Sequence, residues 1–190
     1  MLPPPPGFST IIAGIIYGCR VATAQVRAGD PNAHRQDVAA VWDALWASWL
    51  ISLIIGIPLL GVWSSLSGLL SFMVLTLVIT MLYPVFSYYA LSWLGLQQRY
   101  PSFIITMTWI NNFRELLVLV LVLFFANVPA QNLLLLLTPI TFWMLWAFWR
   151  GASQSLQASG WTGLLMLALL IAVHVMAYVM MALVQSPVSG

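Results

Sequence analysis

A dense group of polar side chains interrupts the apolar segment 102–126, which is long enough to cross a bilayer. The group consists of Asn111, Asn112, Arg114 and Glu115, near the middle of the segment. On a helix, several pairs of these residues lie three or four positions apart, so the group covers a broad face. Charge at this depth has to be surrounded by protein or water, and it often marks a functional path. The same side chains can also hold helices or subunits together.

The free energy of inserting this segment into a bilayer is close to balanced. Arg114 lies twelve residues after Ser102, about 18 Å along a helix and close to mid-membrane. Arg and an acid at the centre each raise the insertion free energy by about 2.5 to 3.5 kcal/mol. Each Leu, Ile, Val or Phe lowers it by about 0.3 to 0.6 kcal/mol. The fifteen residues of those four types nearly offset the two charges. The segment therefore depends on its neighbours. Arg114 and Glu115 point about 100° apart, so either the Arg flexes to pair with the Glu or each finds a partner on another helix.

Other apolar segments carry polar side chains at a similar depth, about 15 to 20 Å from the inner end of each helix. We therefore predict an intramembrane polar cluster formed by Ser52, Tyr83, Asn111, Asn112, Arg114, Glu115, Thr138 and His174. On one interpretation this cluster holds the bundle together or binds a partner subunit. On the other it forms a path for an ion, a proton or an anionic substrate.

Small side chains recur every four residues along the first apolar segment, at Ala44, Ser48, Ser52 and Gly56. Such a stripe lets the backbone of a neighbouring helix come close. We predict that these residues form a helix-packing seam.

The sequence contains no recognisable catalytic motif. There is no GxSxG nucleophile motif, and no serine has an identifiable base. His34 and His174 lie far apart without clustered acids, and Cys19 is the single cysteine, so neither a metal site nor a disulfide is expected. We therefore expect no enzyme activity, no catalytic residue and no cofactor.

The composition indicates that the chain lies mainly in lipid and not in water. Of its 190 residues, 62% are hydrophobic and only 5% are charged, against about 25% charged in soluble domains. The apolar residues come in long blocks without strand-like alternation, which predicts helices rather than a barrel. We expect an all-α fold, a polytopic membrane helix bundle with five transmembrane helices in a domain of residues 38–190. The predicted spans are 41–63, 69–94, 102–126, 132–149 and 161–184, with a loop at 150–160.

Residues 1–37 are expected to form a cytoplasmic N-terminal tail that contains an amphipathic helix over 8–27. Arg20 and Arg27 flank its apolar face, which is typical of a helix lying on lipid headgroups. Packing of the same helix on the cytoplasmic face of the protein fits the pattern equally well.

Every arginine outside the predicted spans falls on one side of a five-span arrangement. By the positive-inside rule that side is cytoplasmic. We therefore expect a protein of a bacterial inner membrane with its N-terminus in the cytoplasm and its C-terminus in the periplasm. The net charge of +2 is too small for a nucleic-acid partner.

Five spans, a cytoplasmic amphipathic segment and a C-terminus outside the cytoplasm resemble the Yip1-domain membrane proteins, in layout alone. The DLYGP stretch of the eukaryotic members is absent here, so their role with small GTPases is not implied. We predict a non-enzymatic scaffold or accessory subunit of a membrane complex, whose partners are the lipid bilayer and either a second membrane protein or another copy of the chain. The alternative is a small transporter or channel, which would need a water-accessible cavity reaching Arg114 and Glu115.

Overall fold

The computed structural model describes residues 4–60, 66–125 and 130–185 of the chain. These residues form six α-helices and one short 3-10 turn, and they include no strand. The helices are α1 Phe8–Ala22, α2 Val38–Leu60, α3 Leu66–Trp93, α4 Tyr100–Phe124, α5 Ala130–Leu156 and α6 Gly160–Gln185, and the turn η2 is Gln97–Arg99. The predicted all-α fold is confirmed.

Three helices within the described residues are long and apolar enough to cross a membrane. Their apolar stretches are Val38–Ile55 in α2, Phe72–Trp93 in α3, and Gln97–Phe124 across η2 and α4. The chain is therefore a membrane protein, as its composition predicts. Five spans go beyond this finding, because the apolar stretch described in α6 is the shorter Gly160–Met176, and α5 carries polar side chains at both ends.

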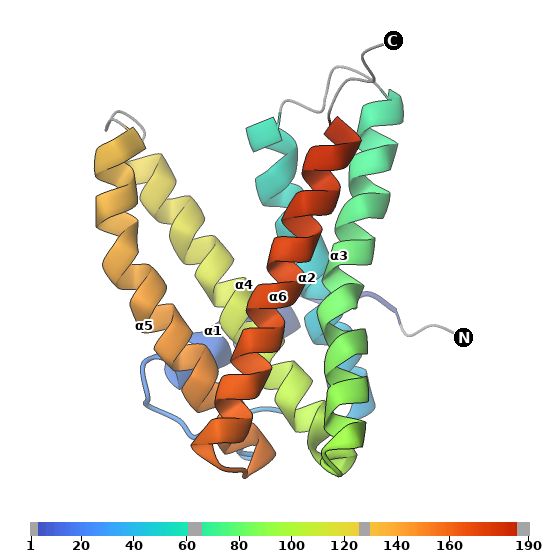
Figure 1. The fold of residues 1–190 in the computed structure, drawn as a ribbon, viewed down its shortest axis with the longest axis vertical. Coiled ribbons are helices and arrows are strands. Elements are labelled where there is room, and N and C mark those ends of the chain that lie inside the picture. Colours follow the sequence, from blue (N-terminus) through green and yellow to red (C-terminus); the bar gives the residue numbers. More distant parts are fainter. Residues whose placement is uncertain (1–3, 61–65, 126–129, 186–190) are drawn as a thin grey trace.

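α4 lies at the centre of the bundle and packs against α1, α2 and α5. Figure 1 shows α2, α3 and α6 together on one side, while the pair α4 and α5 leans away from them toward the upper end. The first half of α4 forms the middle of the core, since every residue from Phe103 to Ile110 is buried. The middle of α4 therefore determines which polar side chains can meet.

α1 ends at Ala22, five residues before the predicted end at Arg27. Ala24 adopts a left-handed conformation with φ of 65°. The N–H of Gln25 donates to the carbonyl of Arg20 at 2.8 Å, and the N–H of Ala24 donates to the carbonyl of Val21 at 3.0 Å. These two bonds form a Schellman motif, which closes the helix although its apolar pattern continues.

α5 continues to Leu156, so the predicted loop at 150–160 is wrong for its first seven residues. Ala152 and Leu156 are almost completely buried. A side chain on Gly151 would crowd the Cδ1 of Ile110 on α4, so the glycine permits a close approach of the two helices. Packing thus outweighs the weak helix propensity of the Gly and Ser residues, and the helix ends where Gln157 adopts a φ of 51°.

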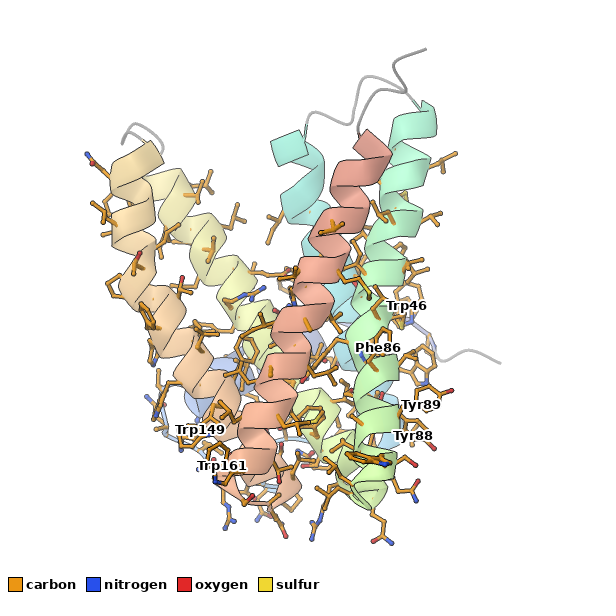
Figure 2. The ribbon with its side chains drawn as sticks, viewed as in Figure 1. Trp46, Phe86, Tyr88, Tyr89, Trp149 and Trp161 are labelled. Carbon is orange, nitrogen blue, oxygen red and sulfur yellow. The ribbon has the colours of Figure 1, made fainter. Side chains whose placement is uncertain are left out.

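Exposed aromatic side chains mark the lower end of the bundle. Figure 2 shows Tyr88, Tyr89, Trp149 and Trp161 around this end, and Trp161 is 80% exposed. Amphipathic rings collect at the membrane–water interface. Their position therefore agrees with one interface near the lower ends of α3, α5 and α6.

Candidate functional site

Glu115 is the centre of the polar contacts in the middle of α4. Its Oε2 accepts a hydrogen bond from the Ser52 hydroxyl of α2 at 3.1 Å, and its Oε1 accepts one from the Asn111 amide at 2.9 Å. The Nη2 of Arg114 lies 3.9 Å from Oε1. The carboxylate thus contacts one donor on another helix and two side chains of its own helix. Pairing with Arg114 and contact with another helix, which the sequence left as alternatives, therefore occur together.

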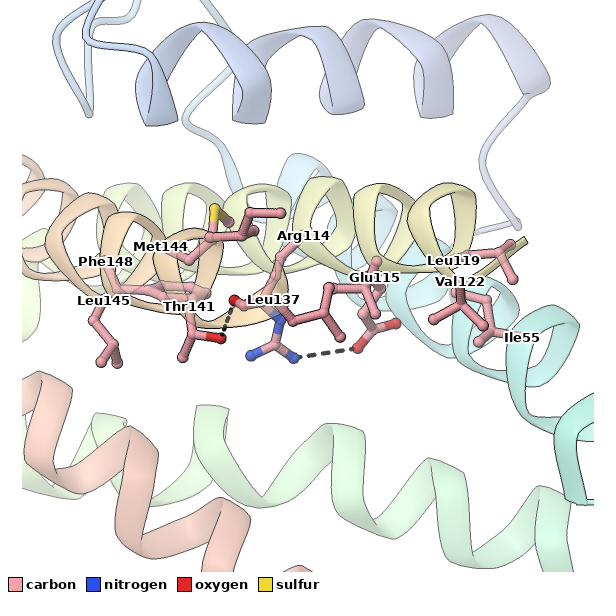
Figure 3. Close-up of a pocket in the computed structure, with 12 residues that line it drawn as sticks. Ile55, Arg114, Glu115, Leu119, Val122, Leu137, Thr141, Met144, Leu145 and Phe148 are labelled. Carbon is pink, nitrogen blue, oxygen red and sulfur yellow. Dashed lines mark hydrogen bonds and ion pairs between the residues drawn. The ribbon is translucent and has the colours of Figure 1, made fainter. Parts of the chain in front are cut away.

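Arg114 points to the other side of Glu115, into a groove. Its guanidinium carbon lies 5.9 Å from the centre of the Phe148 ring on α5, within cation–π range. The side chain is 31% exposed. Arg114 therefore links the polar contacts of Glu115 to an apolar surface (Figure 3).

The groove consists of two adjoining cavities between the pair α4–α5 and the helices α2 and α6. The first has a volume of about 410 Å³ and is lined from α2, α4 and α5. The second has a volume of about 390 Å³ and is lined from α4, α5 and α6. Arg114, Leu145 and Phe148 line both. The remaining walls are apolar except for Glu115 and Thr141 in the first cavity and His174 in the second.

A smaller pocket of about 90 Å³ lies between α2, α3, α4 and α6. Its lining is much more polar than that of the groove. The polar side chains that line it are Ser48, Ser52, Thr80, Tyr83, Thr108, Asn111, Glu115 and His174. Glu115 borders both this polar pocket and the groove.

The predicted polar cluster is brought together in part. The residues that share the polar pocket are Ser52, Tyr83, Asn111, Glu115 and His174. Arg114 lies on the groove side instead. Asn112 is completely buried and donates to the carbonyl of Ala44 at 3.5 Å. Thr138 is exposed on α5 and is absent from the lining of the described cavities.

The predicted seam lies along the contact of α2 with α4. Ala44 and Ser48 are buried, and Ser52 reaches Glu115 across this contact. The surroundings of Gly56 lie outside what the structure describes. The small side chains of α2 are therefore used inside the chain, where they bring α2 close to α4.

The arginines predicted to contact lipid, Arg20 and Arg27, are both exposed at the end of α1 and just beyond it. The other face of α1 packs against α4, with Tyr17 and Val21 buried. Packing of this helix on the protein, one of the two expected arrangements, is therefore present in the structure, and the two arginines project away from it.

A contact that the sequence reasoning missed joins α1 to α4 through Gly14 and Gly18. A Cβ on Gly14 would overlap the indole ring of Trp109, and one on Gly18 would overlap the carbonyl oxygen of Trp109. The segment Gly14-Ile-Ile-Tyr-Gly18 is a GxxxG motif, which is typical of closely packed membrane helices. This motif was the signal available in the sequence.

His34, on the segment between α1 and α2, completes this contact. Its ring stacks on Tyr17 at a centroid distance of 4.9 Å and meets the edge of Trp109 at 5.9 Å. The Tyr17 hydroxyl pairs with that of Thr106 at 3.1 Å and accepts the N–H of Gly29 at 3.1 Å. Burial, followed by the charge of Arg35, lowers the pKa of His34 below its usual value of 6.5.

Within the described residues, no three His, Cys, Asp or Glu side chains converge as a metal site would require. Comparisons of the chain with protein-family models, with curated proteins and with solved structures find no match. The function therefore has to be argued from the groove and from the polar side chains beside it.

Proposed function

We propose that this chain is a non-enzymatic, five-span protein of a bacterial inner membrane that serves as an accessory subunit of a membrane complex. α5 and α6 run alongside the three apolar helices in Figure 1, which supports their crossing the same bilayer. The arginines outside the spans support a cytoplasmic N-terminus and a periplasmic C-terminus. The Yip1-like layout is part of this proposal and rests on the same features.

The groove between α4–α5 and α2–α6 is the observation that carries the proposal. Its walls are almost entirely apolar, with Arg114 near the junction of its two cavities. Ion-selective sites are built from rings of carbonyl or charged groups, whereas apolar walls fit the apolar side chains of another helix. We propose that the groove receives a transmembrane helix of a partner protein, with a polar residue of that helix meeting Arg114.

Photo-crosslinking in native membranes tests this proposal. A photoreactive amino acid at Leu137 and, separately, at Ile140 lies in the groove. The matched control position is Val78, which is exposed on α3 away from the groove. We expect both groove positions to give the same protein adduct, and Val78 to give none.

A filling substitution provides the second part of the test. Leu145 lines both cavities of the groove, so Leu145→Trp should abolish the protein adduct while the folded yield is retained. Adducts with lipid alone at both groove positions, or an adduct that persists in the filled variant, would count against a partner helix.

A small transporter is the second candidate, and one observation favours it. A transport path that uses Arg114 and Glu115 requires a cavity that reaches both residues, and the groove does so. The two candidates differ in the water content of the groove. In a Cys19→Ser background, a cysteine at Leu137 should react with a membrane-impermeant thiol reagent in a transporter, and it should stay unreactive in a chain whose groove holds lipid or a helix.

A further inference from the structure

The polar pocket between α2, α3, α4 and α6 has room for a small ion or a few waters. Its volume is about 90 Å³, which corresponds to about three waters at roughly 30 Å³ each. It differs in lining from the groove: it shares only Glu115 with the first cavity, and only Leu170 and His174 with the second. What it can hold depends on where the hydroxyl and amide protons around it point.

Three hydroxyl groups of the pocket direct their protons toward acceptors of the protein. Ser52 donates to Oε2 of Glu115 at 3.1 Å, Thr80 donates to the carbonyl of Thr76 at 2.8 Å, and Tyr83 donates to the carbonyl of Met166 at 3.5 Å. A hydroxyl has one proton to donate and two lone pairs. Each of these oxygens therefore keeps lone pairs for a guest in the pocket.

The nitrogen-containing side chains are oriented in the same way. Asn111 donates its amide N–H to Glu115, while its Oδ1 is buried without a hydrogen-bond partner among the described residues. The Nδ1 of His174 lies 2.8 Å from the carbonyl of Leu170. A carbonyl can only accept, so Nδ1 carries the proton and Nε2 of the neutral ring is an acceptor.

The pocket thus offers oxygen and nitrogen acceptors around one carboxylate. We infer that it binds a small monovalent cation, Na⁺. The ligands would be the Glu115 carboxylate, Oδ1 of Asn111 and the hydroxyl oxygens of Ser52, Thr80 and Tyr83. Hard cations prefer such oxygen ligands, and an acceptor left buried without a partner is costly.

The charges around the pocket select for a single positive charge. Glu115 provides the one carboxylate, and the guanidinium of Arg114 lies 3.9 Å from it on the groove side. The other titratable side chains of the lining are Tyr83 of α3 and His174 of α6, while α2 contributes hydroxyl groups. Arg114 offsets part of the carboxylate charge, which leaves too little for a divalent ion.

A bound cation would connect α2, α3 and α4 at the depth of Glu115. Because it stabilises the folded chain, its binding should raise the thermal unfolding midpoint in proportion to the logarithm of its concentration. This inference does not depend on a partner helix in the groove.

The experiment uses the full chain, purified in detergent, with NaCl replaced stepwise by choline chloride at constant ionic strength and pH. Choline is too large for the pocket. A midpoint that rises with Na⁺ in the wild type, and does not rise in Glu115→Gln, supports a sodium site. Absence of this rise in the wild type, or an equal rise in Glu115→Gln, overturns the proposal.

A milder pair of variants covers the case in which Glu115→Gln does not fold. Thr80→Val removes one proposed ligand and keeps the side-chain shape. Thr141→Val removes the same kind of bond, to the carbonyl four residues earlier, but lies in the groove. We expect Thr80→Val to need about tenfold more Na⁺ for the same rise, and Thr141→Val to respond as the wild type does. An equal response of the two variants would overturn the assignment to this pocket.

Discussion

Gly18 of α1 lies directly against the backbone carbonyl of Trp109, in the buried middle of α4. A Cβ at position 18 would overlap that carbonyl oxygen, and one at position 14 would overlap the Trp109 ring. Trp109 itself is completely buried. The N-terminal helix is therefore an integral part of the bundle, fixed by two glycines at a spacing of four residues.

Gly18→Ala should destabilise the chain by about 1 to 3 kcal/mol, as overpacking typically does. The reason is that a backbone carbonyl cannot turn away as a flexible side chain can. The unfolding midpoint in detergent measures the effect. Gly7→Ala is the control, because its Cβ would lie 4.0 Å from the nearest atom, the Ser9 hydroxyl. A midpoint of Gly18→Ala equal to that of the wild type would show that α1 does not pack this closely.

The positions of the helices could be predicted from the sequence, because an apolar block long enough to span a bilayer has to satisfy its backbone hydrogen bonds within itself, as a helix does. The first turn of α4, with Pro101 inside it, begins near where the pattern predicts. Helix ends were less accurate. Ala24 and Gln157 adopt left-handed conformations, which neither Ala nor Gln favours. The ends of α1 and α5 therefore could not be predicted from residue type.

The polar cluster was predictable in depth but not in direction. Counting residues along each helix placed Ser52 level with Glu115, and the two are hydrogen-bonded. The rotation of each helix about its axis depends on packing with the others, which a single sequence does not specify. For this reason the sequence could not tell that Arg114 lies in the groove and Asn112 against Ala44.

Glu115→Leu should destabilise the chain more than the double change Arg114→Leu/Glu115→Leu. The single change removes the acceptor of the Ser52 and Asn111 hydrogen bonds and the anion beside Arg114. A buried donor left without an acceptor costs about 1 to 3 kcal/mol. Ser52 and Asn111 are part-buried, so we expect a cost near the lower end of this range. In the double variant the positive charge of Arg114 is removed together with the negative charge beside it, so part of the loss should be recovered.

A double-mutant cycle of unfolding midpoints, completed with Arg114→Leu, measures this coupling. Strictly additive effects of the two single changes would mean that Arg114 and Glu115 do not interact despite their 3.9 Å separation.

Asp37→Ala should cost about 1 kcal/mol, because Asp37 caps the start of α2. Its Oδ1 accepts the N–H of Ala40 at 2.7 Å. This bond, followed by the hydrogen bond from Arg35, holds the pKa of Asp37 below its usual value of 3.8. Asp37→Asn keeps an oxygen for the cap, so it should lose only a fraction of that stability. Denaturation of the three proteins at pH 7 provides the comparison, and an Asn variant as weak as the Ala variant would exclude the cap as the cause.

Acidification should weaken the contact between α1 and α4 through His34. Burial lowers the pKa of His34 in the folded chain below the value of 6.5 that it has when exposed. At pH above 6.5 the imidazole is neutral in both the folded and the unfolded chain, so stability is unaffected. As the pH falls below 6.5, the unfolded chain binds the proton first, and stability declines until the lowered pKa of the folded chain is reached.

His34→Phe isolates this effect, since a phenyl ring can stack on Tyr17 but cannot titrate. The Nε2 of His34 is buried without a hydrogen-bond partner among the described residues, so its replacement removes no hydrogen bond made by that atom. We expect the unfolding midpoint of the wild type to fall between pH 7 and pH 5 by more than that of the Phe variant. Parallel pH profiles of the two proteins would place the His34 ring in water in both states. In that case the ring contacts of His34 with Tyr17 and Trp109 would not contribute to the packing of α1 on α4.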